Sequence, residues 1–138
     1  MSDIKMRGGG CLCGAVRYSV PSQPIVVAVC HCRDCQKQTG SAFSLVAAFP
    51  RSVVSIEGDC ASLETTAASG SPVTRSFCCK CGSPLFSETK SGNEAGLVFV
   101  KAGTLDETLD LAPTAHVWTA SKQAWVQIPD GIYSADRE

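Results

Sequence analysis

Three cysteines within six consecutive positions, residues 30–35, are the side chains of this sequence best suited to chemistry. Cys30, Cys32 and Cys35, here called the cysteine trio, have the spacing C-x-C-x-x-C. Thiolates held so close repel one another unless a cation lies between them, and the soft divalent cation that proteins most often use is zinc. The spacing therefore predicts a zinc site built from three thiolates.

Two further cysteine pairs lie far from the trio in the sequence. They are Cys11-x-Cys13 and Cys78-x-x-Cys81, here called the outer cysteine set, and each pair is followed directly by a glycine that permits a tight turn around a metal. Four thiolates complete a tetrahedral structural zinc site, so we expect the outer set to share one zinc. The alternative is four unrelated core cysteines, which two short spacings beside glycines disfavour.

A zinc bound by the trio would have three protein ligands and keep its fourth position for water or substrate, as catalytic zincs do. Three thiolates and one zinc ion carry one net negative charge, which favours the binding of a substrate thiol over the activation of water. The alternative is a second closed site with His31, Cys60 or Cys79 as fourth ligand. We expect His31 to point away from its neighbouring ligands, Cys79 to turn outward, and Cys60 to be an incidental thiol.

Composition and charge exclude several classes of function. A chain of 138 residues predicts one domain, 1–138, with a core at about 8–134. The net charge of −1, with no basic block, argues against nucleic acid or an anionic membrane as partner. The N-terminus lacks the apolar core of a secretory signal, and the longest apolar runs, at 25–29 and 45–49, are too short to cross a bilayer. We therefore expect a cytoplasmic protein whose clustered cysteines bind metal or take part in catalysis.

Short strands are predicted to carry most of these residues. Apolar and polar residues alternate over 15–20, which predicts a half-buried strand, and the β-branched apolar run 25–29 predicts a fully buried strand ending at Cys30. Further strands are expected at 43–49, 53–56, 62–66, 73–77, 85–87, 97–100 and 115–118, with a polar loop at 89–94. Many short strands separated by turns predict a mostly-β fold.

One short helix is expected after the first two cysteines of the trio. The segment Arg33–Thr39 ends at Gly40, a natural stop for a helix, and places Cys32 and Cys35 on one face. The free N–H groups at a helix start favour thiolate over thiol. The sequence thus offers a local reason for these sulfur atoms to be ionised.

Other side chains are candidates for contact with substrate. His116 is a candidate proton carrier because its free pKa lies near neutrality, and a hydrogen-bonded structural histidine is the alternative. Arg33 and Lys37 could meet a substrate carboxylate, although a solvated helix face is the ordinary role of such residues.

The tail, residues 121–133, is expected to fold back onto the core. Three aromatic residues are expected in the core: Phe77, Trp118 and Trp125.

Several segments of the chain resemble the glutathione-dependent formaldehyde-activating enzyme (GFA) family, also described as the centromere-protein-V-like/GFA domain. They are residues 10–18, 30–41, 75–83, and 116–122 followed by Trp125. The resemblance implies a β-tent fold, in which folded antiparallel sheets surround one zinc at the outer set and a second zinc at the trio. It also implies the activity that names the family, the condensation of glutathione with formaldehyde to S-hydroxymethylglutathione, which is a carbon–sulfur lyase reaction in reverse.

Together these observations predict a zinc-dependent carbon–sulfur lyase-type enzyme that acts on a small-molecule thiol such as glutathione. Cys30, Cys32 and Cys35 would hold the reactive zinc, and His116 would be a candidate for proton transfer. The alternative is a non-catalytic zinc-stabilised β binding module with two structural zincs. A third hypothesis is redox sensing by the trio.

Overall fold

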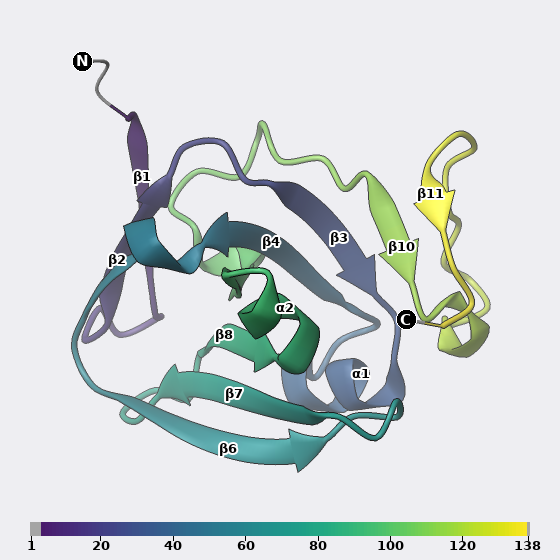
Figure 1. Ribbon diagram of the computed structural model, residues 1–138, viewed down its shortest axis with the longest axis horizontal. Coiled ribbons are helices and arrows are strands. Elements are labelled where there is room, and N and C mark those ends of the chain that lie inside the picture. The colour runs from purple at the N-terminus through teal and green to yellow at the C-terminus, as the bar shows by residue number, and fades with distance from the viewer. Residues whose placement is uncertain (1–3, 138) are drawn as a thin grey trace.

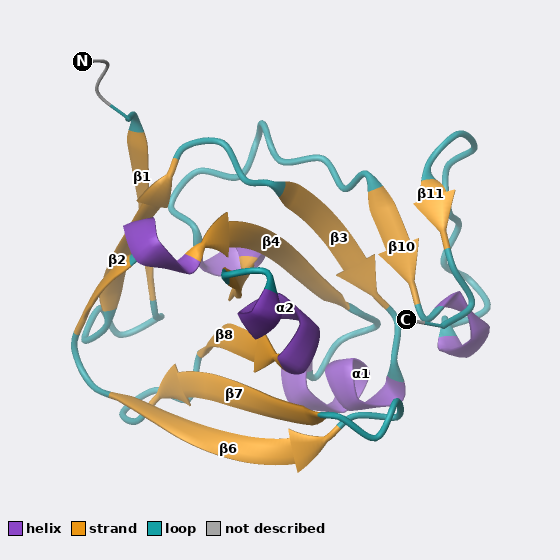
Figure 2. Ribbon diagram, in the orientation of Figure 1, coloured by secondary structure: helices purple, strands orange, loops and turns teal. Residues whose placement is uncertain are grey.

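Short strands dominate the computed structural model, which describes residues 4–137 (Figures 1 and 2). The strands within these residues are β1 Met6–Gly10, β2 Arg17–Pro21, β3 Val26–Cys30, β4 Ser44–Pro50, β5 Ser55–Glu57, β6 Cys60–Thr66, β7 Pro72–Cys78, β8 Pro84–Thr89, β9 Leu97–Lys101, β10 Ala115–Val117 and β11 Tyr133–Ser134. The helices are α1 Arg33–Thr39 and α2 Lys90–Glu94, with 3-10 turns at Arg51–Val53, Ala102–Thr104 and Thr119–Ser121. The mostly-β fold class predicted from the sequence is confirmed.

The strands form two sheets, one of three strands in the order β1-β2-β5 and one of eight in the order β11-β10-β3-β4-β9-β8-β7-β6. Within the series β3-β4-β9-β8-β7-β6 of this sheet, each strand pairs antiparallel with the next. Strand β10 differs because it pairs parallel with both β3 and β11 (Figure 1). This pairing sets His116 opposite Val29 and Val117 opposite Cys30, so the C-terminal part of the chain lies beside the end of β3.

The two faces of the large sheet differ in character. One face packs into the core with almost fully buried side chains: Val27, Ala47, Phe49, Val98 and Val100. Alternate residues of the same strands line a cavity: Ala28, Cys30, Ser44, Val46, Phe99 and Lys101. The expectation of a fully buried strand at 25–29 is therefore wrong, because side chains alternate across a sheet and only one face of β3 lies in the core.

Helix α1 has the predicted bounds. Gly40 ends it in the left-handed conformation, with φ of 65°, and its N–H donates to the carbonyl oxygen of Lys37 at 3.3 Å. The loop expected at 89–94 contains α2 instead, and Thr89 caps this helix by accepting from the N–H of Gly92 at 2.9 Å. No helix among residues 4–137 is long and apolar enough to cross a membrane.

The N-terminal glycines form a strand that the sequence analysis did not predict. Strand β1 pairs antiparallel with β2, where Gly9 lies opposite Tyr18. A Cβ atom at Gly9 would lie 2.4 Å from the Tyr18 ring and 2.7 Å from the carbonyl oxygen of Thr104. Glycine is therefore required here by the close approach of neighbouring residues, which local propensity does not reveal.

Backbone hydrogen bonds join the C-terminal tail to strand β10. Strand β11 pairs with β10, and the N–H of Ala135 donates to the carbonyl oxygen of His116 at 3.0 Å. The expectation of a core position is wrong for Trp125, which is 68% exposed, while Phe77 and Trp118 are only partly buried. Backbone pairing fixes the tail at the sheet edge, so its aromatic rings do not need to enter the core.

Candidate metal centres and the cavity beside them

Four cysteine sulfur atoms from two similar turns face one another: Cys11, Cys13, Cys78 and Cys81. The first turn joins β1 to β2, and the second joins β7 to β8. Each turn ends at a glycine with positive φ, 81° at Gly14 and 78° at Gly82. The N–H of Gly14 donates to the carbonyl oxygen of Cys11 at 3.2 Å, and that of Gly82 to the carbonyl oxygen of Cys78 at 2.9 Å. The two turns therefore share the form expected of metal-binding knuckles.

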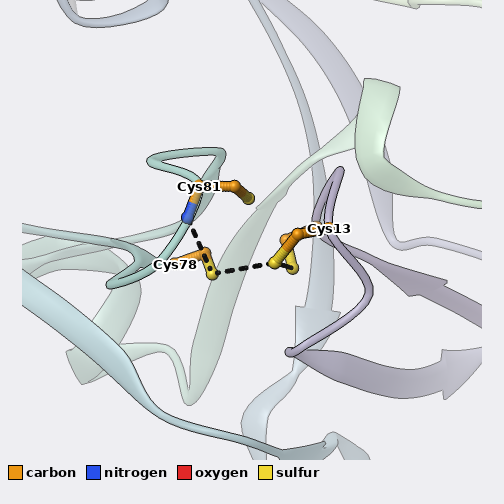
Figure 3. A group of neighbouring side chains, drawn as sticks. Cys13, Cys78 and Cys81 are labelled. Atoms are coloured by element: carbon orange, nitrogen blue, oxygen red, sulfur yellow. Dashed lines mark hydrogen bonds between the residues drawn. The ribbon is translucent and has the colours of Figure 1, made fainter.

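The spacing of these sulfur atoms fits a tetrahedral metal. The Sγ atoms of Cys11 and Cys13 are 3.6 Å apart, those of Cys13 and Cys78 are 3.8 Å apart, and all four lie within 4.8 Å of one another. Figure 3 shows Cys13, Cys78 and Cys81 of this group. A zinc–sulfur distance of about 2.3 Å gives a tetrahedral edge of roughly 3.8 Å. Backbone N–H groups point at the sulfur atoms, as from Val16 to Cys11 Sγ at 3.2 Å. The outer set could hold a metal ion, and zinc suits its four-sulfur donor set.

Ser83 links the two turns, and the sequence analysis did not single it out. Its hydroxyl lies 3.2 Å from Cys81 Sγ and accepts from the N–H of Leu12 at 3.0 Å. Hydrogen bonds from Ser83 lower the pKa of Cys81 to about 5. The signal available in the sequence was a hydroxyl residue two positions after the last ligand candidate. Ser83 thus favours the thiolate that a metal would need.

The trio assembles where β3 runs into α1. Cys30 ends β3, Cys32 is the N-cap residue of α1, and Cys35 lies in its first turn. The Sγ of Cys32 accepts from the backbone N–H of Cys35 at 3.2 Å. The three sulfur atoms lie within 4.8 Å of one another, and among residues 4–137 no histidine, cysteine or carboxylate completes this group as a fourth member. The trio could also hold a metal ion.

A cavity of about 690 Å³ opens beside the trio. Its volume lies within the range of roughly 300–1,000 Å³ that is typical of small-molecule sites. All three cysteines of the trio line it, together with residues of β7, β8, β9, β4 and β10. Strands β3 and β7, which Figure 1 shows in different parts of the curved large sheet, both contribute residues to this cavity. A small molecule in this cavity would meet the trio directly.

Residues 6–121 match the model of the family "Glutathione-dependent formaldehyde-activating enzyme", which is more than half of the chain. The chain belongs to the GFA family. A crystal structure of a Rhodobacter sphaeroides protein is similar to this chain, with a TM-score of 0.57 and 19% identity over 77% of this chain and 91% of that chain. This likeness shows a shared fold. A comparison with curated proteins finds no match.

The three residues considered from the sequence as a fourth metal ligand do not join the sulfur atoms of the trio in this GFA-family protein. Cys60 and Cys79 are exposed, and Cys60 lies on β6 opposite Cys78. His31 is fully buried, and its Nε2 atom lies 2.9 Å from Nδ1 of His116. Neither histidine lines the cavity. The contacts of His116 are those of the hydrogen-bonded structural histidine that the sequence analysis gave as its alternative role.

Hydrogen bonds among the three sulfur atoms of the trio shift the pKa values of its thiols in different directions. Hydrogen bonds from Cys30 and Cys35 lower the pKa of Cys32, while the same sulfur contacts raise the pKa of Cys30. These sulfur contacts therefore make Cys32 a stronger acid than Cys30. Metal binding requires the other thiols to lose their protons as well.

Two basic side chains in the cavity wall were not predicted. Lys101 is 6% exposed and donates from Nζ to Ser44 Oγ at 2.7 Å, and Arg75 is 7% exposed. Burial lowers the pKa of Lys101, and negative charge on the nearby trio opposes this effect. Arg33 and Lys37, named from the sequence as candidates for carboxylate contact with a solvated helix face as their ordinary role, are exposed and do not line the cavity.

Proposed function

We propose that this GFA-family protein catalyses the formation or cleavage of an adduct between a small thiol and a small carbonyl compound. The observation that carries the proposal is the trio, a three-sulfur group that opens into a cavity of about 690 Å³. The family is named for glutathione and formaldehyde, which supports S-hydroxymethylglutathione as the adduct. In the cleavage direction the enzyme would be a carbon–sulfur lyase.

The reaction joins the thiol sulfur to the carbonyl carbon, and the thiol proton ends on the carbonyl oxygen. The reaction is redox-neutral overall and needs no external oxidant or reductant. Cys30, Cys32 and Cys35 would hold a zinc ion, which supplies the positive charge that stabilises a thiolate near neutral pH. The cavity wall would exclude bulk water and orient the thiol towards the carbonyl carbon.

The other residues would support this site. The outer set would hold a structural zinc that ties the β1–β2 turn to the β7–β8 turn. His116 would act as a positioning residue through its contact with His31, which is favoured over direct proton transfer because neither ring lines the cavity. A reducing compartment such as the cytoplasm would keep the thiols available.

Substitution of one trio cysteine tests the proposal. Cys35→Ser is expected to lose one of two zinc ions per chain and the rate of adduct exchange above background, while the far-ultraviolet circular dichroism stays the same. Cys79→Ser is the matched control, because Cys79 is exposed and lies outside both sulfur groups. Elemental analysis gives the zinc content, and exchange NMR with labelled formaldehyde and glutathione gives the rate. Equal rates in the wild type and Cys35→Ser would overturn the proposal and leave a zinc-stabilised binding module.

A further inference from the structure

Two buried cations in the cavity wall have no carboxylate partner. The ion pairs among residues 4–137 use Arg7, Arg17 and Arg51, whereas Arg75 and Lys101 form none. Burying a charge is costly unless an opposite charge or several hydrogen bonds compensate it. The compensation must come from the negative charge of the trio, from a ligand in the cavity, or from both.

The donors of both cations remain largely available to a ligand. Lys101 uses one of its three ammonium protons in its bond to Ser44. Arg75 makes one side-chain hydrogen bond among the described residues, from Nε to Thr65 Oγ1, at a long 3.5 Å. The forked end of its guanidinium suits the two oxygen atoms of a carboxylate.

An unsatisfied hydroxyl lies next to Arg75. Ser87 is 7% exposed, lines the same cavity, and its Oγ has no hydrogen-bond partner within residues 4–137. Ser87 on β8 is the cross-strand partner of Arg75 on β7, and directly opposed side chains have Cβ atoms roughly 4.5–5.5 Å apart. Because buried polar groups are almost always paired, this hydroxyl points to a polar occupant of the cavity.

The strand register connects these donors to the trio. Lys101 on β9 lies opposite Val46 on β4, and its side chain reaches Ser44, which is the cross-strand partner of Cys30. With a divalent metal bound, the trio would carry one negative charge, so the two cations leave the wall with a positive excess. A molecule whose thiol lies at the trio and whose acid group lies at Arg75 would match this distribution of charge.

We infer that Arg75, Ser87 and Lys101 form an anion site that binds a carboxylate of the thiol substrate. The cavity then selects thiols that carry an acid group over neutral thiols. This inference rests on the proposed function, because it assumes that the thiol lies at the trio. The competing explanation is that both cations merely neutralise thiolate charge, in which case acidic and neutral thiols would depend on them equally.

Calorimetric titration of the zinc-loaded protein with glutathione and with glutathione dimethyl ester separates the two explanations. The wild type is expected to bind glutathione at least about tenfold more tightly than the ester, the usual size of a lost charged hydrogen bond. Arg75→Met is expected to weaken glutathione binding by a similar factor and leave ester binding unchanged. Ser87→Ala should produce a smaller loss of the same kind, and Arg33→Met, on the exposed face of α1, should produce none.

Kinetics and zinc content complete the test. Arg75→Met should raise KM for glutathione more than it lowers kcat, because the carboxylate does not take part in bond formation. Zinc content and melting temperature confirm that the variant is folded. The inference would be overturned if the wild type bound glutathione and the ester equally well, or if Arg75→Met weakened the binding of both ligands equally. It would also be overturned if neither ligand bound. Selective binding of glutathione without adduct exchange would reject the proposed function alone.

Discussion

The Nε2 atom of His31 lies 2.9 Å from the Nδ1 atom of His116, and both side chains are buried. Their rings stack with centroids 5.2 Å apart. His31 lies between two members of the trio, whereas His116 belongs to β10, 85 residues further along the chain. The pair therefore connects the turn that carries Cys30 and Cys32 to the C-terminal part of the fold.

Replacing His116 should weaken the trio without affecting the outer set. In His116→Ala, the buried Nε2 of His31 loses its partner, which costs about 1–3 kcal/mol of unfolding free energy. The turn at the trio should then bind zinc more weakly, while the outer set keeps its ion. Chemical denaturation and competitive zinc titration measure the two effects. Trp125→Ala, at a position 68% exposed, should change unfolding free energy by less than about 0.5 kcal/mol and serves as control.

The zinc ions proposed for the outer set and for the trio should leave the protein under different conditions. The outer set lies against the core, with Cys11 and Cys78 in its main buried cluster, so loss of this ion should unfold the protein. The trio borders the cavity and should release its ion to a chelator while the fold persists. A chromogenic chelator combined with circular dichroism should therefore show an early release without unfolding and a later release with it. Release of both ions in one step would contradict the assignment of different roles.

The outer set predicts a severe effect of a single substitution. Cys13→Ser removes one of the four sulfur atoms proposed to hold a structural zinc, and structural zinc binding contributes on the order of 10 kcal/mol to folding. The variant should be largely unfolded at room temperature even in excess zinc. Cys60→Ser is the control, because Cys60 is an exposed thiol outside both sulfur groups and should fold normally. One-dimensional NMR distinguishes the two outcomes, and a folded Cys13→Ser protein would exclude a structural role for this ligand.

Gly9 should not tolerate a side chain. In Gly9→Ala the new Cβ would lie 2.4 Å from the Tyr18 ring and 2.7 Å from the carbonyl oxygen of Thr104, so strands β1 and β2 must shift. Overpacking of this kind typically costs about 1–3 kcal/mol of unfolding free energy. Gly103→Ala is the control, since its Cβ would meet no atom within 4 Å. Denaturant titration of both variants should show destabilisation at Gly9 alone.

Alkaline pH should destabilise the fold through Tyr18. Burial raises the pKa of Tyr18 to about 12, from an ordinary value near 10, although its hydroxyl has Thr104 Oγ1 as a partner at 2.7 Å. The unfolded chain therefore loses this proton first, and the contribution of Tyr18 is complete below about pH 10 and disappears as pH rises through about 12. Tyr18→Phe should show a weaker loss of stability over this window than the wild type. Identical pH profiles would assign the alkaline transition to other groups.

The local features of this fold could be predicted from the sequence. The bounds of α1 agree because a helix ends where its own residues permit, here at Gly40 with φ of 65°. The close approach of the sulfur atoms within each cysteine pair and within the trio agrees because the ligand candidates there are only two or three residues apart along the backbone. The exposed position of Cys79 also follows from the form of its turn. Each of these predictions depended on a few consecutive residues.

Relationships between distant strands could not be predicted in this way. The amino-acid sequence by itself determined which residues are able to bind metal, because sulfur chemistry and short spacing are local properties. Only the tertiary structure decided that Arg75, Ser87 and Lys101 share the cavity with the trio and that His116 meets His31. Strand register and the parallel pairing of β10 with β3 set these contacts, and both depend on how the whole sheet packs.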